Sequence, residues 1–291
     1  MLMKEILKKS VIEASYLFHR FIDFLFGPTV KVMSVDETIA ELQNTGKSLV
    51  RFGDGELLII RGKNIHFQKT NDILRRELQE IIGYHRDGLM VSVQDIFNGV
   101  GLYVPESREF WKEHLFFYRK YYRSLCNHKR NYASTSFSRA YITIANKEKS
   151  RVWFDEIKKI WSCKDVVIVE GETTHNGVGN DLFEGCNNVQ RIICPSKNAF
   201  DRLEDIEAAC YKMEKDKLFL VSLGPTAKPL VRDLYEAGYR AIDIGQLDYE
   251  YELYLAKAET KKDIAKHHVL SIEDNARAGY QEYLDEIIFR I

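Results

Sequence analysis

The sequence has little that would suit a secreted protein or a zinc-binding protein. Its five cysteines are odd in number, and none has the C-x-x-C spacing of a zinc site. This pattern is typical of reduced thiols and predicts a cytoplasmic protein without a disulfide framework. The chain also has no apolar run long enough to span a bilayer. Residues 1–27 lack the continuous apolar core and the small-residue cleavage site of a signal peptide.

An excess of charge of either sign is also lacking. The formal net charge is -1 over 291 residues, so no overall field favours nucleic acid, and we expect no nucleic-acid partner. The chain is 45% hydrophobic and 29% charged, an ordinary composition for a globular protein. A chain of this length can bury a large core, as one large or two small domains.

Residues 1–27 predict an amphipathic helix that Gly27-Pro28 would end. Its apolar side chains recur at helical spacing, with Lys4, Lys8, Lys9 and Arg20 mostly between them. Such a helix can lie on an anionic membrane surface as a peripheral contact. The alternative is a docking face, against the body of the protein or a second subunit in a homodimer. We expect a helical extension over 1–27, a main domain over 28–270 and a helical tail over 271–291.

The main domain alternates predicted strands with predicted helices. The strands are Ser48–Phe52, Leu89–Val93, Val166–Val169, Val189–Ile193, Leu218–Leu223 and Ala241–Ile244. The helices begin at a capping box of Ser34 with Glu37, at Thr70 as an N-cap, and at Glu106, Asn198 and Pro225. This alternation predicts an α/β fold with a mostly parallel sheet and flanking helices. Ligands bind beyond the carboxyl ends of such strands.

The most informative segment runs from Arg51 to Glu56, with the sequence Arg-Phe-Gly-Asp-Gly-Glu. Gly53 allows the backbone to approach a ligand closely. Asp54 and Glu56, two residues apart, can point the same way from an extended segment and offer oxygens to Mg²⁺ or Mn²⁺. Arg51 adds a guanidinium suited to phosphate. The segment therefore predicts a site for a metal-bound diphosphate; a tight hairpin turn is the alternative, because Asp-Gly is a common turn dipeptide.

Four later segments that follow predicted strands are rich in glycine and polar residues. Three of them suit an anion, because glycine exposes backbone N–H groups and a helix N-terminus attracts phosphate. Their candidate residues are Asn176, Gly177, Gly179, Asn180, Ser196, Asn198, Gly224, Pro225 and Thr226. The fourth contains Asp248 and Glu250. These acids can stabilise a helix start through its dipole, or one of them can accept a proton from a hydroxyl.

Taken in order, these motifs resemble one bacterial family. The motifs are Arg51 to Glu56, Val169-Glu-Gly-Glu172, Gly177 to Phe183, Arg191 to Pro195 with Asn198-Ala-Phe200, Leu223 to Ala227, and Asp243 to Glu252. They are similar to the former domain-of-unknown-function family that defines the D-type glycosyltransferase (GT-D) fold, found in streptococcal adhesin glycosylation and polysaccharide loci. The resemblance covers Val35 to Leu255. It makes residues 28–270 a glycosyltransferase domain.

The resemblance implies a Rossmann-like fold that uses a UDP-sugar, typically UDP-glucose, and a divalent metal, Mn²⁺ or Mg²⁺. The family's metal-binding Asp-x-Glu falls on Asp54 and Glu56, its preceding arginine on Arg51, and its Ser-Arg pair on Ser138-Arg139. Three positions depart from the family pattern: Gln246 stands in place of a usual His, Leu253 in place of Trp and Ala140 in place of Pro. The first departure puts a catalytic histidine in doubt.

We therefore expect a metal-dependent glycosyltransferase that moves a hexose from a UDP-sugar to a glycan or glycoprotein acceptor. Glu250 is the candidate general base for inversion at the anomeric carbon, and Asp248 is the second candidate. Two alternatives remain open. Gln246 leaves room for a non-catalytic nucleotide-sugar binder or scaffold. A phosphatase or phosphotransferase with Asp54 as nucleophile is disfavoured, because Glu56 and Leu58 replace the usual Asp-x-Asp-x-Thr continuation.

Overall fold

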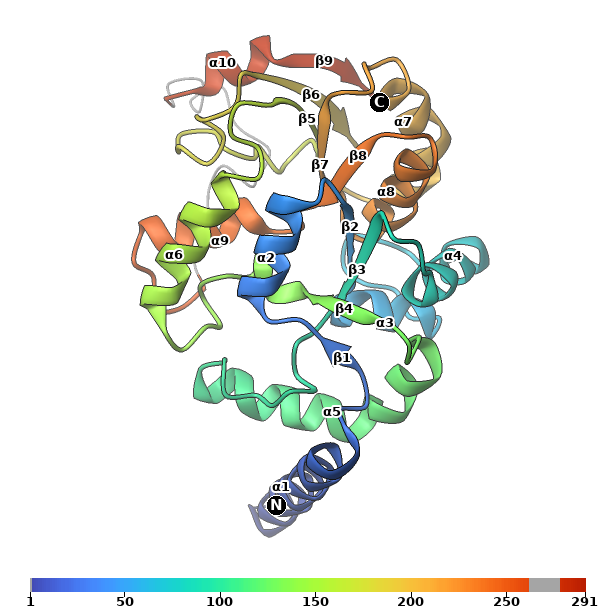
Figure 1. The fold of residues 1–291 in the computed structure, drawn as a ribbon, viewed down its shortest axis with the longest axis vertical. Helices are drawn as coiled ribbons and strands as arrows, with labels where there is room; N and C mark the ends of the chain where they lie inside the picture. Colours follow the sequence, from blue (N-terminus) through green and yellow to red (C-terminus); the bar gives the residue numbers. More distant parts are fainter. Residues whose placement is uncertain (1, 262–277) are drawn as a thin grey trace.

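The computed structural model describes residues 2–261 and 278–291, and a nine-stranded sheet runs through them (Figure 1). The strand order is β1-β4-β3-β2-β8-β7-β5-β6-β9, and every pairing between named strands is parallel. The strands are β1 (Lys31–Val32), β2 (Ser48–Arg51), β3 (Leu89–Val93), β4 (Asn131–Ser134), β5 (Asp165–Gly171), β6 (Asn188–Cys194), β7 (Leu218–Ser222), β8 (Arg240–Asp243) and β9 (Ile287–Arg290). Their carboxyl ends therefore meet at one edge, as the α/β prediction requires.

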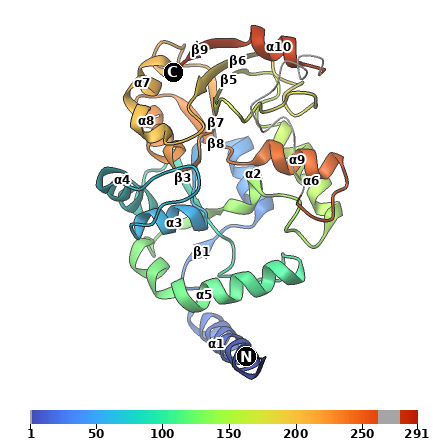
Figure 2. The ribbon, with the colours of Figure 1, turned by 180° about the vertical axis from the view of Figure 1, so that it is seen from behind.

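Helices cover both faces of the sheet (Figures 1 and 2). The helices are α1 (Leu2–Phe26), α2 (Val35–Asn44), α3 (Asp54–Ile60), α4 (Asp72–Gly83), α5 (Pro105–Leu125), α6 (Lys147–Lys158), α7 (Leu203–Cys210), α8 (Ala227–Glu236), α9 (Leu247–Leu255) and α10 (Tyr280–Asp285). Short 3₁₀ helices are η1 (Thr135–Ser138), η2 (Ala199–Arg202) and η3 (Gly224–Thr226). Helices α4, α7 and α8 pack together on one face, and α2, α6 and α9 on the other.

The neighbouring strands β2 and β8 send the chain to opposite faces of the sheet. After β2 it continues into α3 and α4, and α4 packs against α8. After β8 it continues into α9, which packs against α6. Adjacent parallel strands whose connections leave on opposite faces open a crevice at their carboxyl ends, where α/β proteins bind ligands. The fold therefore predicts a ligand site at the carboxyl ends of β2 and β8.

The six predicted strands are all present. They could be predicted because each contains a run of apolar residues that is buried in the sheet. All residues of β2 and β3 are buried, as parallel strands covered on both faces require. Strands β1 and β4 were not predicted, because these short segments carry few apolar residues, and β9 lies in the tail that was expected to be helical. The tail over 271–291, expected to be helical, contains α10 but ends in β9, which joins the main sheet. Residues 271–277 of that tail lie outside the described residues.

Helix starts follow local capping chemistry. The predicted capping box is confirmed: Ser34 Oγ accepts a hydrogen bond from Glu37 N (3.1 Å), and Glu37 Oε2 accepts one from Ser34 N (2.7 Å). Thr70 as an N-cap is wrong, because Asn71 Oδ1 accepts the bond from Leu74 N at the start of α4. The helix predicted from Asn198 is divided into η2 and α7. None of the described helices is long and apolar enough to cross a membrane.

Candidate functional site

Arg51 and Gly245 meet where the carboxyl ends of β2 and β8 adjoin. Arg51 is the last residue of β2 and is 8% exposed. Gly245 follows β8 with a φ of 52°, a conformation that L residues rarely adopt. A Cβ on Gly245 would lie 2.8 Å from Arg51 Nη1. The glycine is therefore required twice, for its backbone conformation and for the space that the guanidinium occupies.

The buried guanidinium of Arg51 lacks an ionic partner in the described part of the chain. Its Nε is buried without a hydrogen-bond partner, and it forms no ion pair with any residue that the structure describes. Burial lowers the pKa of Arg51, and the negative charge of Asp243 offsets part of that effect. Buried polar groups are nearly always hydrogen-bonded, so an unsatisfied arginine at a strand end is a candidate site for an anion.

Arg139 adds a second guanidinium to this junction from the end of η1. Its Nη1 donates a hydrogen bond to Gln246 Oε1 (3.1 Å), and its Nε lies 3.5 Å from Glu250 Oε1. The positive charge of Arg139 contributes to the lowered pKa of Arg51, because the two cations lie near each other. Two neighbouring guanidinium groups favour a multiply charged anion such as a diphosphate. The structure therefore brings together Arg51 and Arg139, which the sequence placed 88 positions apart (139 − 51).

Asp54 and Glu56 begin helix α3, and the expectation that they lie on an extended segment is wrong. The hairpin alternative is wrong as well, because the chain turns directly from β2 into the helix. Two residues that are two positions apart on an α-helix point to nearly opposite sides of it. Asp54 is therefore exposed, whereas Glu56 is 6% exposed. Glu56 Oε2 accepts a hydrogen bond from Gly53 N (2.7 Å). That contact satisfies a free N–H at the helix start.

Lys228 and Asp243 complete a buried charge cluster with Glu56. Lys228 Nζ lies 2.8 Å from Glu56 Oε1 and 3.0 Å from Asp243 Oδ2. Burial alone would raise the pKa of Glu56, but the ammonium of Lys228 holds it below its ordinary value. Burial raises the pKa of Asp243, with Lys228 acting against that rise. Sequence reasoning missed both partners. The position of Asp243 at the end of a strand was a usable signal, whereas nothing local marks Lys228.

The predicted metal ligands are only partly suited to a metal in this arrangement. Among residues 2–261 and 278–291, no group of three His, Cys, Asp or Glu side chains is placed to hold a metal ion. Mg²⁺ and related cations commonly take one or two carboxylates and complete their shell with substrate phosphates and water. Exposed Asp54 fits that role. Glu56 would first have to lose its contact with Lys228, so ligation by both residues stays a prediction.

The candidate bases Asp248 and Glu250 lie on α9, and both are fully buried. Glu250 Oε2 accepts hydrogen bonds from the backbone N–H groups of Tyr141 (3.0 Å) and Ile142 (2.9 Å). Asp248 Oδ1 accepts bonds from Gly177 N and from Asn180 Nδ2, each at 2.9 Å. The N–H of Gly177, expected to face a bound anion, thus faces Asp248. Both acids join α9 to the loops beside the junction, and a role as base stays a prediction.

The other candidate residues divide between two loops. Asn176 donates from its backbone N (2.7 Å) and Nδ2 (2.9 Å) to Glu170 Oε2, so it belongs to a buried network with Arg191. Gly179, with a φ of 77°, follows in the same loop and is exposed. Ser196 Oγ accepts a hydrogen bond from Thr173 N (2.9 Å). These residues shape the loops after β5 and β6.

The segment Gly224-Pro225-Thr226 is covered by the loop that follows α3. A Cβ on Gly224 would lie 2.5 Å from the ring of Phe67, and Thr226 Oγ1 donates to Gln68 Oε1 (3.4 Å). Asn198 N donates to the carbonyl oxygen of Phe67 (2.9 Å). The expected phosphate contacts at Gly224 and Thr226 therefore require this loop to move aside.

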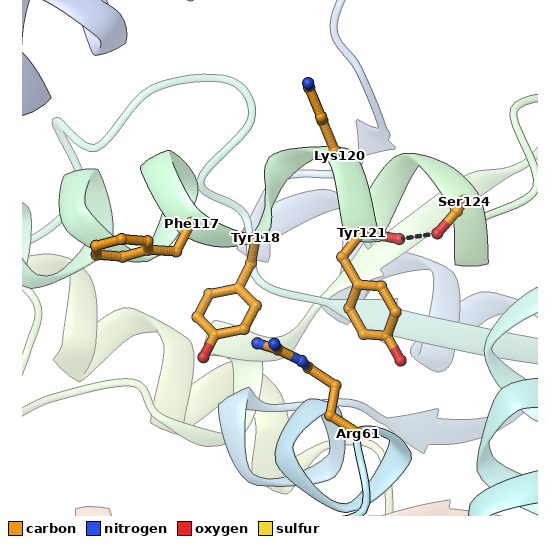
Figure 3. Close-up of a pocket in the computed structure, with 6 residues that line it drawn as sticks. All are labelled: Arg61, Phe117, Tyr118, Lys120, Tyr121 and Ser124. Carbon is orange, nitrogen blue, oxygen red and sulfur yellow. Dashed lines mark hydrogen bonds between the residues drawn. The ribbon is translucent and has the colours of Figure 1, made fainter.

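A cavity of about 360 Å³ lies beside the far end of α3 (Figure 3). The guanidinium carbon of Arg61, the residue after α3, lies 5.1 Å from the centre of the Tyr118 ring and 5.9 Å from that of Tyr121. Figure 3 shows both rings directed from α5 toward Arg61. Because Asp54 begins α3 and Arg61 follows it, the cavity is about 10 Å along the helix from the candidate metal ligand.

The comparisons with known proteins agree with this fold. The family model of the glycosyltransferase GT-D fold matches residues 49–272, most of the chain. This protein belongs to the GT-D fold glycosyltransferase family. A solved structure described as the highly conserved domain of unknown function 1792 with a distinct glycosyltransferase fold is 37% identical, with a TM-score of 0.86. The alignment covers 96% of this GT-D protein and 99% of that chain.

Other relatives of this GT-D protein come from streptococci. A solved structure described as a new glycosyltransferase from Streptococcus sanguinis is 38% identical, with a TM-score of 0.83, and covers 90% of this chain and 99% of its own. A probable glycosyl transferase of Streptococcus gordonii is 41% identical over 82% of this chain and 35% of its own length. Glycosyltransferase GlyD of Streptococcus pneumoniae serotype 4 is 39% identical over 82% and 29%. The chain therefore spans about a third of these two curated relatives.

Proposed function

We propose that this GT-D protein transfers a hexose, glucose from UDP-glucose being the first choice, to a glycan or glycoprotein acceptor with inversion at the anomeric carbon. The observation that carries the proposal is the buried guanidinium of Arg51, which lacks an ionic partner among the described residues and lies against Gly245. Arg139 beside it supplies a second positive charge. A nucleoside diphosphate is the anion that matches two adjacent guanidinium groups at a strand end.

In this proposal Arg51 and Arg139 bind the diphosphate and stabilise the charge that develops on it as the sugar leaves. The divalent metal, when bound, would neutralise part of the same charge. Asp54 would hold the metal from the exposed start of α3, joined by Glu56 if Lys228 releases it. Lys228 and Asp243 fix the backbone around this position, because their buried charges are paired.

The acceptor hydroxyl needs a base, and Glu250 is the proposed one, with Asp248 second. Glu250 lies 3.5 Å from Arg139, so it adjoins the cation that binds the donor. A carboxylate on the face opposite the leaving diphosphate would take the hydroxyl proton as the new bond forms. Because Glu250 is fully buried, the acceptor hydroxyl reaches it only if the segment at Tyr141 and Ile142 opens.

The acceptor is proposed to lie over the aromatic cavity at Arg61. Phe117, Tyr118 and Tyr121 line that cavity, and the flat C–H faces of sugar rings pack well on aromatic surfaces. The free cysteines among the described residues support a cytoplasmic location, where thiols stay reduced.

Calorimetric titration with UDP and Mn²⁺ tests the donor site. Arg51→Ala and Arg139→Ala should each weaken UDP binding at least about tenfold, because a hydrogen bond to a charged group contributes about 1.5–3 kcal/mol. Arg151→Ala is the matched control, since Arg151 is an exposed arginine on α6. Unchanged binding in both site variants would reject the proposal. Absence of UDP release from UDP-glucose, with or without an acceptor, would favour the non-catalytic binder.

A further inference from the structure

Helix α1 packs on the protein through its polar side. Two of its acids form ion pairs with α5. Glu13 Oε2 lies 2.6 Å from Nζ of Lys112, and Asp23 Oδ2 lies 3.0 Å from Nη1 of Arg119. The hydroxyl of Tyr16 accepts a hydrogen bond from Val100 N (3.2 Å). These residues recur on one side of the helix, so its contact with α5 is built mainly from ion pairs and hydrogen bonds.

The apolar side of α1 consequently faces away from the protein. Phe24 is 85% exposed and Phe26 is 80% exposed. Exposed with them are Met3, Ile6, Leu7, Val11, Leu17, Phe18, Phe21 and Leu25. A surface helix normally turns this stripe inward, and monomeric proteins rarely expose apolar patches of this extent. The interpretation of the stripe as a docking face for the body of the protein is therefore wrong.

The shape of the apolar side favours a lipid surface over a second copy of the helix. At about 100° per residue, the exposed apolar side chains cover an arc of roughly 200°. A two-helix contact uses a narrower seam and needs large side chains along its centre. This arc is broader than such a seam, and large side chains are spread across all of it, from Ile6 and Phe24 at one border to Phe26 at the other.

The charges near the apolar side match an anionic surface. Lys4, Lys8 and Lys9 are exposed on the first half of α1. On a helical wheel Lys4 lies near one border of the apolar arc, where a lysine side chain reaches lipid headgroups while the apolar side chains enter the acyl region. Lys8 Nζ lies 2.6 Å from Glu113 Oε1 on α5, so its charge is already paired. Figures 1 and 2 show α1 at one end of the long axis, beside α5 and away from β9.

We propose that α1 lies in the headgroup region of an anionic bilayer with its apolar side embedded. The ion pairs to α5 then hold the whole domain at the surface, with the cavity on α5 close to the membrane. This inference stands on α1 alone and does not depend on which donor the protein uses.

Sedimentation with vesicles tests the proposal. The full chain should sediment with vesicles of phosphatidylglycerol and phosphatidylcholine, and less with phosphatidylcholine alone. Phe18→Ser with Phe21→Ser should lower the partition coefficient about 100-fold, since burying each phenylalanine is worth at least one factor of ten. The control removes equally exposed apolar residues elsewhere, by Ile73→Ser on α4 with Val152→Ser on α6, and should change nothing.

A reporter variant gives a second measurement. The three native tryptophans, Trp111, Trp153 and Trp161, are buried, so Phe21→Trp adds an exposed fluorophore whose emission should shift to the blue on anionic vesicles. Any of three results would overturn the proposal: the protein does not sediment with vesicles, the double serine variant still binds them, or the emission of the tryptophan variant does not shift. So would a dimer in light scattering that the double variant dissociates, if the protein binds no vesicles.

Discussion

Gly245 Cα and the guanidinium of Arg51 are in direct contact across the β2/β8 junction, so close that a methyl group on the glycine would lie 2.8 Å from Arg51 Nη1. Gly245 has a backbone conformation that only glycine adopts easily, and its lack of a side chain leaves room for Arg51, one of the two guanidinium groups proposed to hold the donor. A change at residue 245 should therefore act on binding through the position of Arg51.

Gly245→Ala should displace Arg51 and raise the dissociation constant for UDP about tenfold, which calorimetry measures. Gly46→Ala is the matched control: its φ of 62° carries a similar backbone strain, but a Cβ there meets nothing within 4 Å. Both variants should lose about 1–2 kcal/mol of stability from the left-handed conformation. Equal UDP affinity in the two variants would show that the contact with Arg51 is without consequence.

Lys228→Met should destabilise the protein by about 3–5 kcal/mol at pH 7, because it leaves the carboxylates of Glu56 and Asp243 buried without their cation. Urea unfolding measures the loss. Lys147→Met, which removes a lysine beside Tyr141 without a buried carboxylate pair, should cost much less. A loss below about 1 kcal/mol for Lys228→Met would mean that the cluster contributes little.

Asp54→Asn should affect UDP binding, whereas Glu56→Gln should affect the stability of the fold. Asp54 is exposed, so its variant should keep its stability within about 0.5 kcal/mol and lose Mn²⁺-dependent UDP binding. Glu56→Gln should lose stability whether or not Mn²⁺ is present, since it removes the charge that faces Lys228. Thermal unfolding with and without Mn²⁺ and UDP separates the two. Full Mn²⁺-dependent transfer in both variants would remove the metal site from this segment.

Glu250→Gln should lower kcat about 10²–10⁴-fold if Glu250 is the base, while UDP binding is retained. Glutamine keeps an oxygen that can accept from Tyr141 N and Ile142 N, so the loop should stay in place. Asp248→Asn is the comparison, and the anomeric proton of the product, read by NMR, reports inversion. Near-normal turnover in Glu250→Gln, or an α-product from an α-donor, would assign the base to another residue.

Stability should fall between pH 6.5 and 4 through His114. Burial lowers the pKa of His114 to about 4, so in this range the unfolded chain binds a proton that the folded protein excludes. Stability therefore rises with pH across the range and is lost as the pH falls, by up to about 3 kcal/mol. His114→Gln cannot titrate and should show a flatter profile in urea unfolding at pH 7 and pH 4.5. Parallel profiles for the two proteins would contradict this.

Local pattern was enough for much of the fold and for the family. The apolar runs at Leu89–Val93 and Leu218–Leu223 predicted buried parallel strands, because strands covered on both faces need continuous apolar residues. Ser34 with Glu37 predicted a helix start, since both partners of a capping box lie within one turn. The ordered motifs predicted the GT-D family, and the family match over 49–272 confirms it.

The sequence by itself therefore determined the features that depend on neighbouring residues along the chain. These features are the apolar runs of the strands, the helix caps, the family motifs and the amphipathic pattern of α1. Tertiary structure alone decided which partner each charge received. Lys228 pairs with Glu56, whereas the guanidinium of Arg51 has no ion pair among the described residues. Helix α1 turns its polar side inward because α5 offers it Lys112 and Arg119. These ion pairs join residues far apart in sequence, and burial sets their strength, so no local pattern can specify them.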